Sequence, residues 1–417
     1  MTGDLRVDAE RLWASHMELA TFTEPGRPHT RRPFSALHRD GRAWLRQQFT
    51  DAGLDVSVDA GGNLGGRLQG ADCPQQVIMT GSHSDTVPAG GRFDGISGVL
   101  TGLEIARVFN DRGHRPRYGF EVVDFLSEEP SDFGVSCVGS RAIAGLLSQD
   151  MLAASDPSGQ PLRDAIDDIG GASSSLGSPL RPQGAIKAFL ELHIEQGKVL
   201  EETGTDIGVV TNIVGIRRIG VVVGGRADHA GTTPMDLRTD ALAGAARLVA
   251  DVQTTARRMA DEGNGYIVAT VGQLTVHPGG TNVVPDRVDF TIDLRADRRS
   301  LIEAFSDEFR SGAEARIADL GTSVETTIQT DGVPTDCDDG LQATIDDACQ
   351  RLGYSYRRMP SGAGHDAVYL AKLAPAGMVF IPCREGRSHC PEEWTTSGQL
   401  ETGANVMLQA ILAVDQT

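Results

Sequence analysis

Short runs of apolar residues recur along the chain, and each of them ends at a turn that is rich in glycine or in charged residues. They are "QVIMTG" at 76–81, "YGFEVVDFL" at 118–126, "IKAFLEL" at 186–192 and "GMVFIP" at 377–382. Continuous apolar runs of this length are typical of strands in a parallel sheet that helices cover on both faces. Helical patterns at 41–53 and 98–113 lie between such runs. The alternation of strand and helix predicts an α/β fold with a mostly parallel sheet.

The segment from about residue 215 to residue 331 follows a different order. Its patterns indicate strand, helix, strand, strand, helix and strand: "IGVVVGG", 240–262, "YIVATVGQLTV", "RVDFTIDLRA", 300–320 and "SVETTIQT". This βαββαβ order is the ferredoxin-like arrangement. A chain of 417 residues is also long enough for about two domains. We therefore expect one domain built from residues 1–213 and 332–417, and a second domain, 214–331, inserted into it.

The charge balance narrows the choice of partners. The chain carries 57 acidic and 38 basic residues, a formal net charge of −19, which disfavours nucleic acid and anionic membranes as partners. No stretch approaches the roughly 18 apolar residues of a membrane span, and the charged N-terminal residues lack the apolar segment of a signal peptide. The six cysteines form no CxxC pair. We therefore expect reduced thiols in a cytoplasmic protein.

Ionisable residues stand at or just after the end of each predicted core strand. Ligands of open α/β sheets bind at the carboxyl ends of the strands, so we expect these side chains to converge on one rim. Two or three imidazoles with three carboxylates suit one or two divalent cations such as Zn²⁺ or Mn²⁺. In chain order the residues are His83, Asp85, Asp94, Glu128, Glu129, His193, Glu195 and His389.

Each of these residues also has a simpler interpretation. A single histidine in a turn is more often a surface residue than a ligand, and the adjacent Glu128 and Glu129 would ordinarily be a solvated pair. The turn "AGGRFDG" lacks both GxGxxG and GxxxxGK[ST], which disfavours a phosphate-binding loop. The occurrence of such residues at every predicted strand end favours the metal site.

Several motifs, taken in their order along the chain, resemble the hydantoinase/carbamoylase family of amidohydrolases. This family includes N-carbamoyl-L-amino-acid hydrolases, allantoate amidohydrolases, ureidoglycolate hydrolases and β-ureidopropionases. The resemblance implies a catalytic domain of the dinuclear-metal aminopeptidase type and an inserted domain that serves as a dimerisation lid. The motifs are "SHSDTVPAGGRFDGISGVL", "SEEPSDFGVSCVGSRAIAG", "ELHIEQGKVLE", "ADHAGTTPMDLRTDA", "GGTNVVPDRVDFTIDLR", "SGAGHDA" and "GRSHCPEEWT".

The resemblance also implies a role for each residue of the metal site. One cation would be held by His83, Asp94 and His193, and the other by Asp94, Glu129 and His389, so that Asp94 bridges two divalent ions per subunit. These would be Zn²⁺ or Mn²⁺, with Co²⁺ or Ni²⁺ as further candidates. Glu128 would be the general base. Asp85 would hydrogen-bond the second imidazole nitrogen of His83 and fix its tautomer.

Substrate contacts are implied in both predicted domains. Gln196, Asn282 and Arg295 would bind the substrate, with Arg295 holding a carboxylate in bidentate fashion, although a salt bridge to Asp293 or Asp297 would also explain that arginine. His229 would stabilise the oxyanion of the partner subunit's substrate in a homodimer, although it also suits a simple turn. The backbone of the glycine-rich turn would approach the substrate closely; its residues are Gly362, Ala363 and Gly364.

The expected activity is metal-dependent hydrolysis of a linear ureido or amide C–N bond in a small anionic substrate. An N-carbamoyl-L-amino acid, converted to the amino acid, CO₂ and NH₃, is the leading candidate. Alternatives are allantoate or ureidoglycolate hydrolysis, β-ureidopropionase activity, and plain deacylation or dipeptide cleavage. A catalytically silent metal-binding sensor is the alternative outside the enzyme class, and the presence of Glu128 disfavours it. The chain departs from many relatives at Asp132, Arg387 and Cys390.

Overall fold

The computed structural model describes residues 5–417, which divide into two compact units. The first unit runs to Thr211 and resumes as Asp336–Met359 and Gly364–Thr417, and the second comprises Asn212–Thr335 and Pro360–Ala363. The predicted second domain, 214–331, is a few residues shorter at each end than the second unit, and the sequence assigned residues 360–363 to the first domain. They group with the second because the Val214 N–H donates to the carbonyl of Ser361 at 3.0 Å and Arg295 Nη1 donates to the carbonyl of Gly362 at 2.9 Å.

The first unit is built on one mixed sheet. Strand neighbours follow the order β1-β2-β4-β3-β5-β15-β6-β13, and β14 also pairs with β6. The central neighbours β4, β3, β5 and β15 are mutually parallel. Antiparallel pairs flank them: β1 with β2, β2 with β4, and β6 with β15. The strands are β1 Asp55–Val58, β2 Leu64–Leu68, β3 Cys73–His83, β4 Tyr118–Phe125, β5 Ile186–Ile194, β6 Ile207–Ile213, β13 Thr335–Asp336, β14 Tyr356–Ser361 and β15 Ala376–Ile381.

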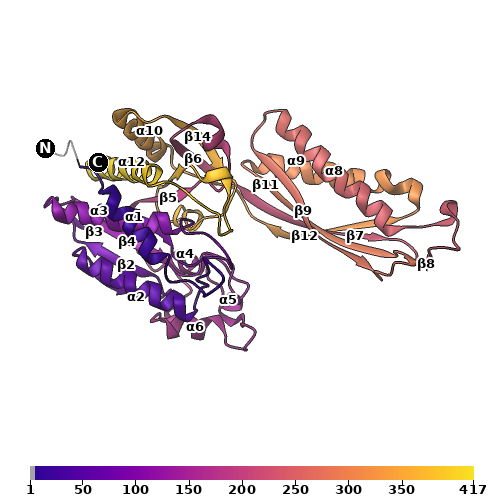
Figure 1. Ribbon diagram of the computed structural model, residues 1–417, viewed down its shortest axis with the longest axis horizontal. Coiled ribbons are helices and arrows are strands. Elements are labelled where there is room, and N and C mark those ends of the chain that lie inside the picture. The colour runs from indigo at the N-terminus through magenta and orange to yellow at the C-terminus, as the bar shows by residue number, and fades with distance from the viewer. Residues whose placement is uncertain (1–4) are drawn as a thin grey trace. The chain divides into compact units, whose positions relative to one another are not determined.

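Helices cover this sheet and bury its central strands (Figure 1). All residues of β4 and β15 are buried, which explains why the sequence shows these strands as continuous apolar runs. One large apolar core joins helices α1, α2, α3, α10 and α12 to the sheet, and a smaller one lies around α4, α5 and α6. The helices are α1 Ala9–Leu19, α2 Ala36–Asp51, α3 Ile96–Asp111, α4 Val138–Ile143, α5 Gln149–Ala153, α6 Leu162–Asp168, α7 Val199–Thr203, α10 Asp339–Leu352, α11 Ala367–Leu370 and α12 Ser397–Asp415.

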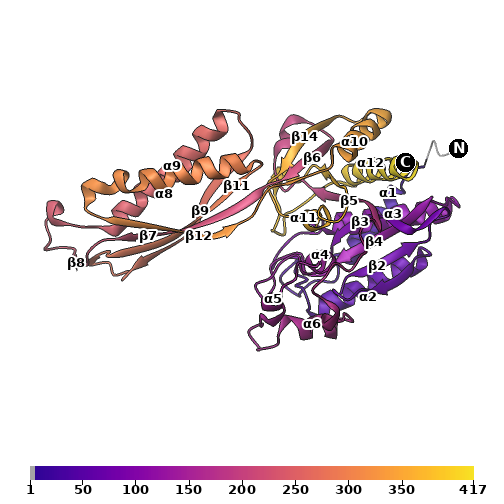
Figure 2. The same ribbon diagram turned by 180° about the vertical axis from the view of Figure 1, so that it is seen from behind.

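The second unit has a four-stranded antiparallel sheet in the order β12-β7-β11-β9. Helices α8 and α9 pack against it and share one apolar core with it (Figure 2). The first helix begins after Asp240, whose carboxylate accepts hydrogen bonds from the N–H groups of Leu242 and Ala243, as expected of an N-cap. The elements are β7 Gly215–Gly224, α8 Ala241–Asp261, β9 Ile267–His277, β11 Arg287–Ala296, α9 Arg299–Ile317 and β12 Ser323–Asp331, with a small ladder between β8 Asp228–His229 and β10 Val283–Val284.

The predicted α/β class and the βαββαβ order of the inserted segment are confirmed. The strands that the sequence did not reveal lie outside the parallel centre of the sheet. Strand β1 alternates exposed and half-buried residues over "DVSV", and β2 is the glycine-containing "LGGRL", so neither forms an apolar run. Among residues 5–417, no helix is long and apolar enough to span a membrane.

Candidate metal centre

The parallel centre of the sheet brings the predicted ligand segments to one rim. His83 is the last residue of β3 and pairs in register with Phe125, the last residue of β4, so the glutamate pair after β4 follows close by. His193 lies near the end of β5 and pairs with Phe380 of β15. All four carboxyl ends therefore meet at one edge, as the ligand rule for open α/β sheets requires.

Asp94 lies at the centre of this cluster, between two groups of potential ligands. Its Oδ1 is 3.2 Å from His193 Nε2 and 3.6 Å from His83 Nε2, whereas its Oδ2 is 3.2 Å from His389 Nε2. His389 Nε2 is in turn 3.2 Å from Glu129 Oε1. The two carboxylate oxygens of Asp94 thus face different ligand groups, which is the geometry of a bridging ligand.

The donor atoms fit divalent cations. Within each group, the one atom that each residue offers lies within 4.8 Å of the others; the groups are His83, Asp94 and His193, and Asp94, Glu129 and His389. Ligands at about 2.0–2.1 Å from a tetrahedral Zn²⁺ are about 3.3 Å apart. The observed N···O distances of 3.2 to 3.6 Å match that spacing. Imidazole and carboxylate donors also suit Zn²⁺ and Mn²⁺.

The glycine that follows Asp94 makes room for the metal-facing side of His83. Gly95 has a φ of 67°, and a Cβ atom there would lie 2.3 Å from His83 Nε2. Any side chain at this position would push the imidazole away from Asp94. The glycine-rich turn that the sequence showed is therefore a packing requirement of the site.

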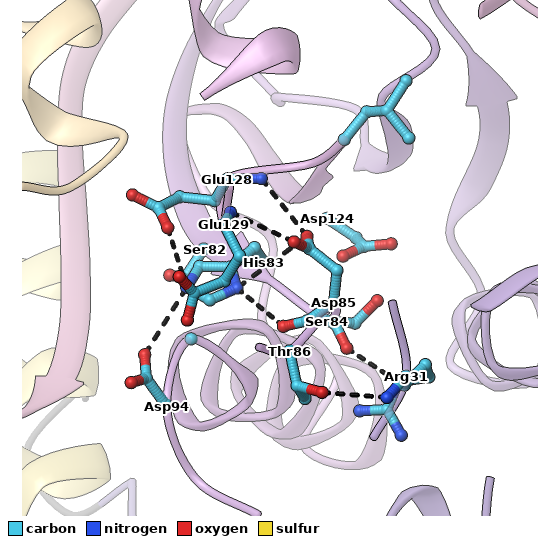
Figure 3. A network of polar contacts seen from close by, with 12 residues as sticks. Arg31, Ser82, His83, Ser84, Asp85, Thr86, Asp94, Asp124, Glu128 and Glu129 are labelled. Atoms are coloured by element: carbon cyan, nitrogen blue, oxygen red, sulfur yellow. Dashed lines mark hydrogen bonds and ion pairs between the residues drawn. The ribbon is translucent and has the colours of Figure 1, made fainter. Parts of the chain in front are cut away.

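The expected hydrogen bond between His83 and Asp85 is present, but it goes to the main chain of Asp85. His83 Nδ1 lies 3.0 Å from the backbone carbonyl of Asp85 and donates to it, whereas the Asp85 carboxylate is 3.9 Å from that nitrogen. The carboxylate instead accepts hydrogen bonds from the N–H groups of Glu128 and Glu129, at 3.3 and 3.1 Å (Figure 3). The tautomer of His83 is thus set by a main-chain oxygen, and the carboxylate of Asp85 holds the glutamate pair.

Glu128 and Glu129 are not the solvated pair that their adjacency suggested. Glu129 is buried and faces His389, whereas Glu128 faces His83, with Oε2 at 3.7 Å from Nε2. Glu128 Oε1 also accepts a hydrogen bond from Cys137 Sγ at 3.3 Å. Glu128 belongs to neither ligand group, so its carboxylate is left for proton transfer.

Burial and neighbouring charge shift the pKa values of the cluster. Burial raises the pKa of Glu128 well above its usual value, against the opposing charge of His83. For Asp94, burial alone would raise the pKa, but hydrogen bonds with His193 and His389 outweigh it and hold the pKa well below the usual value. Hydrogen bonds to Asp94 and Glu129 raise the pKa of His389 to about 11.

We expect cation binding to release protons in protein first stripped by a chelator. A metal ion requires neutral imidazoles, and His389, with a pKa of about 11, is protonated throughout the neutral range. The apparent affinity for Zn²⁺ should therefore rise as the pH rises from about 7 to about 9. Calorimetric titration in two buffers of different ionisation enthalpy measures the protons released. A pH-independent affinity with no buffer effect would contradict these protonation states.

Gln196 lies in the same cluster as the ligands. Its Nε2 donates to Asp94 Oδ2 at 2.7 Å, while its Oε1 is buried with no hydrogen-bond partner among the described residues. A free amide oxygen beside the bridging carboxylate suits a substrate N–H donor. Substrate contact by Gln196 remains a prediction.

The other predicted substrate residues lie mainly in the second unit. His229 pairs with Val283 in the β8–β10 ladder, and the Ala230 N–H donates to the carbonyl of Asn282, so Asn282 lies next to His229 just outside the ladder. Arg295 Nε donates to Asp293 Oδ1 at 2.7 Å, so the predicted alternative of a salt bridge is realised. Gly362 and Ala363 belong to this unit and Gly364 to the first.

The tautomer of His229 follows from its main-chain contact. The N–H of Gly231 donates to His229 Nδ1 at 3.0 Å, and a backbone N–H is only a donor. The proton of the neutral ring therefore sits on Nε2, on an exposed side chain. This tautomer presents a donor, as an oxyanion-stabilising histidine must.

Several residues of the cluster have no counterpart in the sequence prediction. Glu191 accepts from Ser82 Oγ at 2.7 Å, and His365 packs edge-on against His193 with ring centroids 4.6 Å apart. Glu393 accepts from the N–H of Asp94. All three stand within quoted motifs, "ELHIEQG", "SGAGHDA" and "HCPEEW", but only the fold shows which side chain faces the ligands. Arg387, a departure from the family pattern, pairs with the exposed Glu392 at 3.0 Å.

Comparison with known proteins supports these observations. Residues 79–413 match the sequence profile of Peptidase family M20/M25/M40. An N-carbamoyl-L-amino acid amidohydrolase of Geobacillus stearothermophilus is 38% identical, with 98% of this chain and 99% of that protein covered. An allantoate amidohydrolase of Bacillus subtilis is 35% identical over 91% of this chain and 90% of its own length. The crystal structure of a hydantoinase/carbamoylase family amidase from Burkholderia multivorans superposes with a TM-score of 0.91, at 38% identity and 99% coverage of both chains.

Proposed function

Because this chain belongs to Peptidase family M20/M25/M40 and, within it, to the hydantoinase/carbamoylase amidases, we propose that it hydrolyses the ureido C–N bond of an N-carbamoyl-L-amino acid. The products are the amino acid, CO₂ and NH₃. The observation that carries the proposal is the position of Asp94 between two His/carboxylate groups, with the unligated Glu128 beside them.

Two divalent cations per subunit fit these groups. His83, Asp94 and His193 would hold one, and Asp94, Glu129 and His389 the other. Bound there, such cations would acidify a water molecule and polarise the oxygen of the substrate. The preferred ions are Zn²⁺ and Mn²⁺, on the strength of the mixed imidazole and carboxylate donors.

The protein's own contribution is proton transfer and orientation. Glu128 accepts the proton of the attacking water and returns it to the nitrogen that leaves when the C–N bond breaks. Burial is the main cause that raises its pKa well above the usual range of a glutamate, and raised carboxyl pKa values are one way in which enzymes tune a general base. Asp85 keeps the main chain of the glutamate pair fixed through two hydrogen bonds, and Cys137 orients the carboxylate itself.

Substrate selectivity would come from groups that match an anionic ureido acid. The unpartnered Oε1 of Gln196 would accept a ureido N–H. Arg295 keeps a guanidinium nitrogen, Nη2, that the Asp293 and Gly362 contacts do not use, and it would bind the substrate carboxylate. Asn282 and the backbone of residues 362–364 would complete the binding site. His229, with its proton on Nε2, would stabilise the developing oxyanion.

We further propose that the protein acts as a cytoplasmic homodimer in which the inserted unit serves as a lid. His229 would then act on the substrate of the partner subunit. Six free cysteines suit a reducing compartment.

A substrate panel on metal-reconstituted protein tests the proposed activity. It compares N-carbamoyl-L-amino acids, N-carbamoyl-β-alanine, allantoate and ureidoglycolate by the ammonia released, with an N-acetyl amino acid and a dipeptide as substrates that release no ammonia. The proposal expects the highest kcat/KM for an N-carbamoyl-L-amino acid. A higher value for allantoate or ureidoglycolate would move the activity to that substrate. Absence of turnover on the whole panel would contradict the enzyme assignment.

A further inference from the structure

One buried carboxylate of the first unit has no role in the mechanism above. Glu393 lies four residues after His389, and its side chain is about as buried as a residue can be, with 1% exposed. A buried carboxylate is costly unless hydrogen bonds satisfy it. Its hydrogen bonds therefore indicate what the carboxylate is for.

Among residues 5–417, the groups within hydrogen-bond distance of the Glu393 carboxylate all belong to the ligand segments. Its Oε1 accepts from the N–H of Phe93 at 2.8 Å and from the N–H of Asp94 at 3.1 Å. Its Oε2 is 2.8 Å from the hydroxyl of Ser388, the residue before His389. One carboxylate thus connects the loop that carries Asp94 with the segment that carries His389, although these residues are almost 300 positions apart.

Ser388 closes this connection on the ligand itself. Its hydroxyl oxygen lies 2.7 Å from Asp94 Oδ2 and 2.8 Å from Glu393 Oε2. A hydroxyl carries one proton, so Ser388 donates to one of these two carboxylates at a time. Glu393 thus holds Asp94 directly through its main-chain N–H and shares the hydroxyl of Ser388 with the Asp94 carboxylate.

The main chain at Gly91 packs tightly against the carboxylate of Glu393. A Cβ atom at Gly91 would lie 1.8 Å from Glu393 Oε1 and 1.9 Å from its Cδ. Residues 91–94 therefore pass directly over the carboxylate. A methyl group on Gly91 would have to displace Glu393, because the other end of that contact is fixed by the backbone.

We propose that Glu393 is a positioning residue that fixes Asp94 and His389 relative to each other and so sets the affinity for the cation these two residues share. The inference rests on the proposed metal-dependent function. Groups that orient ligands from behind commonly change metal affinity by about 10- to 100-fold when removed. Asp85 has a similar place on the neighbouring segment, where its buried carboxylate accepts from the N–H groups of Glu128 and Glu129.

The test is a Zn²⁺ titration of the chelator-stripped, full-length protein, in competition with a chelating dye. Glu393→Ala should weaken the binding of one of the two Zn²⁺ ions by about 10-fold or more. Glu393→Gln should stay within about threefold of the wild type, because its amide oxygen still accepts both N–H groups. Its NH₂ group would donate to Ser388, which leaves the hydroxyl proton for Asp94.

Gly91→Ala provides an independent approach, because it changes no polar group. It should reproduce the loss of Zn²⁺ affinity by displacing the Glu393 carboxylate. Combined with Glu393→Ala it should add no further loss, since the space is then free and the two changes act through one interaction.

Glu104→Ala is the matched control for general destabilisation. Glu104 is likewise buried, with 0% exposed, and accepts from the N–H of Asp8 and from Arg11, away from the ligand segments. This variant should lower the Tm and leave the Zn²⁺ affinity unchanged.

Each outcome decides between the proposals. Wild-type protein that fails to bind two Zn²⁺ ions would overturn the proposed function and this inference with it. Two tightly bound ions in the wild type together with unchanged affinity in Glu393→Ala would overturn the inference alone, as would an equal loss in Glu104→Ala. If Glu393→Ala does not fold, Gly91→Ala decides, and an unchanged affinity there rejects the positioning role.

Discussion

Replacement of Glu128 by glutamine is expected to lower kcat by about 10²- to 10⁴-fold while the bound metal content and the Tm stay near the wild-type values. Glutamine keeps the size of the side chain and an oxygen that accepts the Cys137 hydrogen bond, but it cannot take a proton from water. The main-chain N–H groups of Glu128 and Glu129 donate to the Asp85 carboxylate. These hydrogen bonds do not involve the side chain that is replaced, so they remain in the variant. Metal analysis, thermal unfolding and steady-state kinetics on one preparation measure the three quantities.

Glu195→Gln is the matched control for this experiment. Glu195 is another glutamate at the end of a core strand, and it accepts from the N–H groups of Val199 and Leu200 at the start of α7. These hydrogen bonds turn its carboxylate towards α7, so kcat should change by less than about threefold. Undiminished turnover in Glu128→Gln would remove Glu128 from proton transfer, whereas loss of metal would make it a ligand instead.

The same variant examines the proposed homodimer. His229→Ala subunits keep Glu128, and Glu128→Gln subunits keep His229, so a mixed dimer contains one complete site if His229 acts across the dimer. Mixing the two inactive variants under conditions that exchange subunits should restore part of the activity. Exchanged dimers without recovered activity would place His229 and Glu128 of one subunit at the same site.

The sequence predicts the fold best for strands that are buried on both faces of the sheet, because such strands appear as continuous apolar runs. The central strands β3, β4, β5 and β15 are of this kind, and the rule that ligands bind at their carboxyl ends predicts a common rim. The ladder register places His83 beside the end of β4 and His193 beside β15, which is why residues hundreds of positions apart gather around Asp94. The outer strands β1 and β2 were not predicted from the sequence, because short strands that are half-exposed or rich in glycine show no apolar run.

The hydrogen bonds that hold the ligand residues in position could not be predicted from the sequence, for a different reason. A sequence shows that Asp85 follows His83 by two positions, but it does not show whether the imidazole bonds to its carboxylate or its carbonyl. The answer depends on the geometry of the turn. In the structure His83 hydrogen-bonds the carbonyl of Asp85, and the carboxylate of Asp85 accepts from the N–H groups of the glutamate pair. Glu393 meets Asp94 only through the fold of two distant segments. Such contacts have no local pattern to read.

Asp94→Asn should have the second large effect, because it acts on both cations at once. One carboxylate oxygen of Asp94 faces His83 and His193, and the other faces His389. Asparagine keeps the volume and the main-chain hydrogen bond to Glu393, but it is neutral and its amide nitrogen is not a ligand. We expect the affinity for both ions to fall by at least about 100-fold and turnover to disappear with them.

His389→Asn separates the bridging role of Asp94 from simple loss of a ligand. In the described part of the chain, the ion-pair contacts of His389 are with Asp94 Oδ2 and Glu129. Its loss should therefore release one cation and leave the ion held by His83 and His193 in place. Zn²⁺ per subunit, determined after dialysis, is then expected to fall from about two in the wild type to about one in His389→Asn and towards zero in Asp94→Asn. Equal metal content in the two variants would mean that Asp94 serves one ion only, and the shared carboxylate at the centre of the proposed mechanism would have to be abandoned.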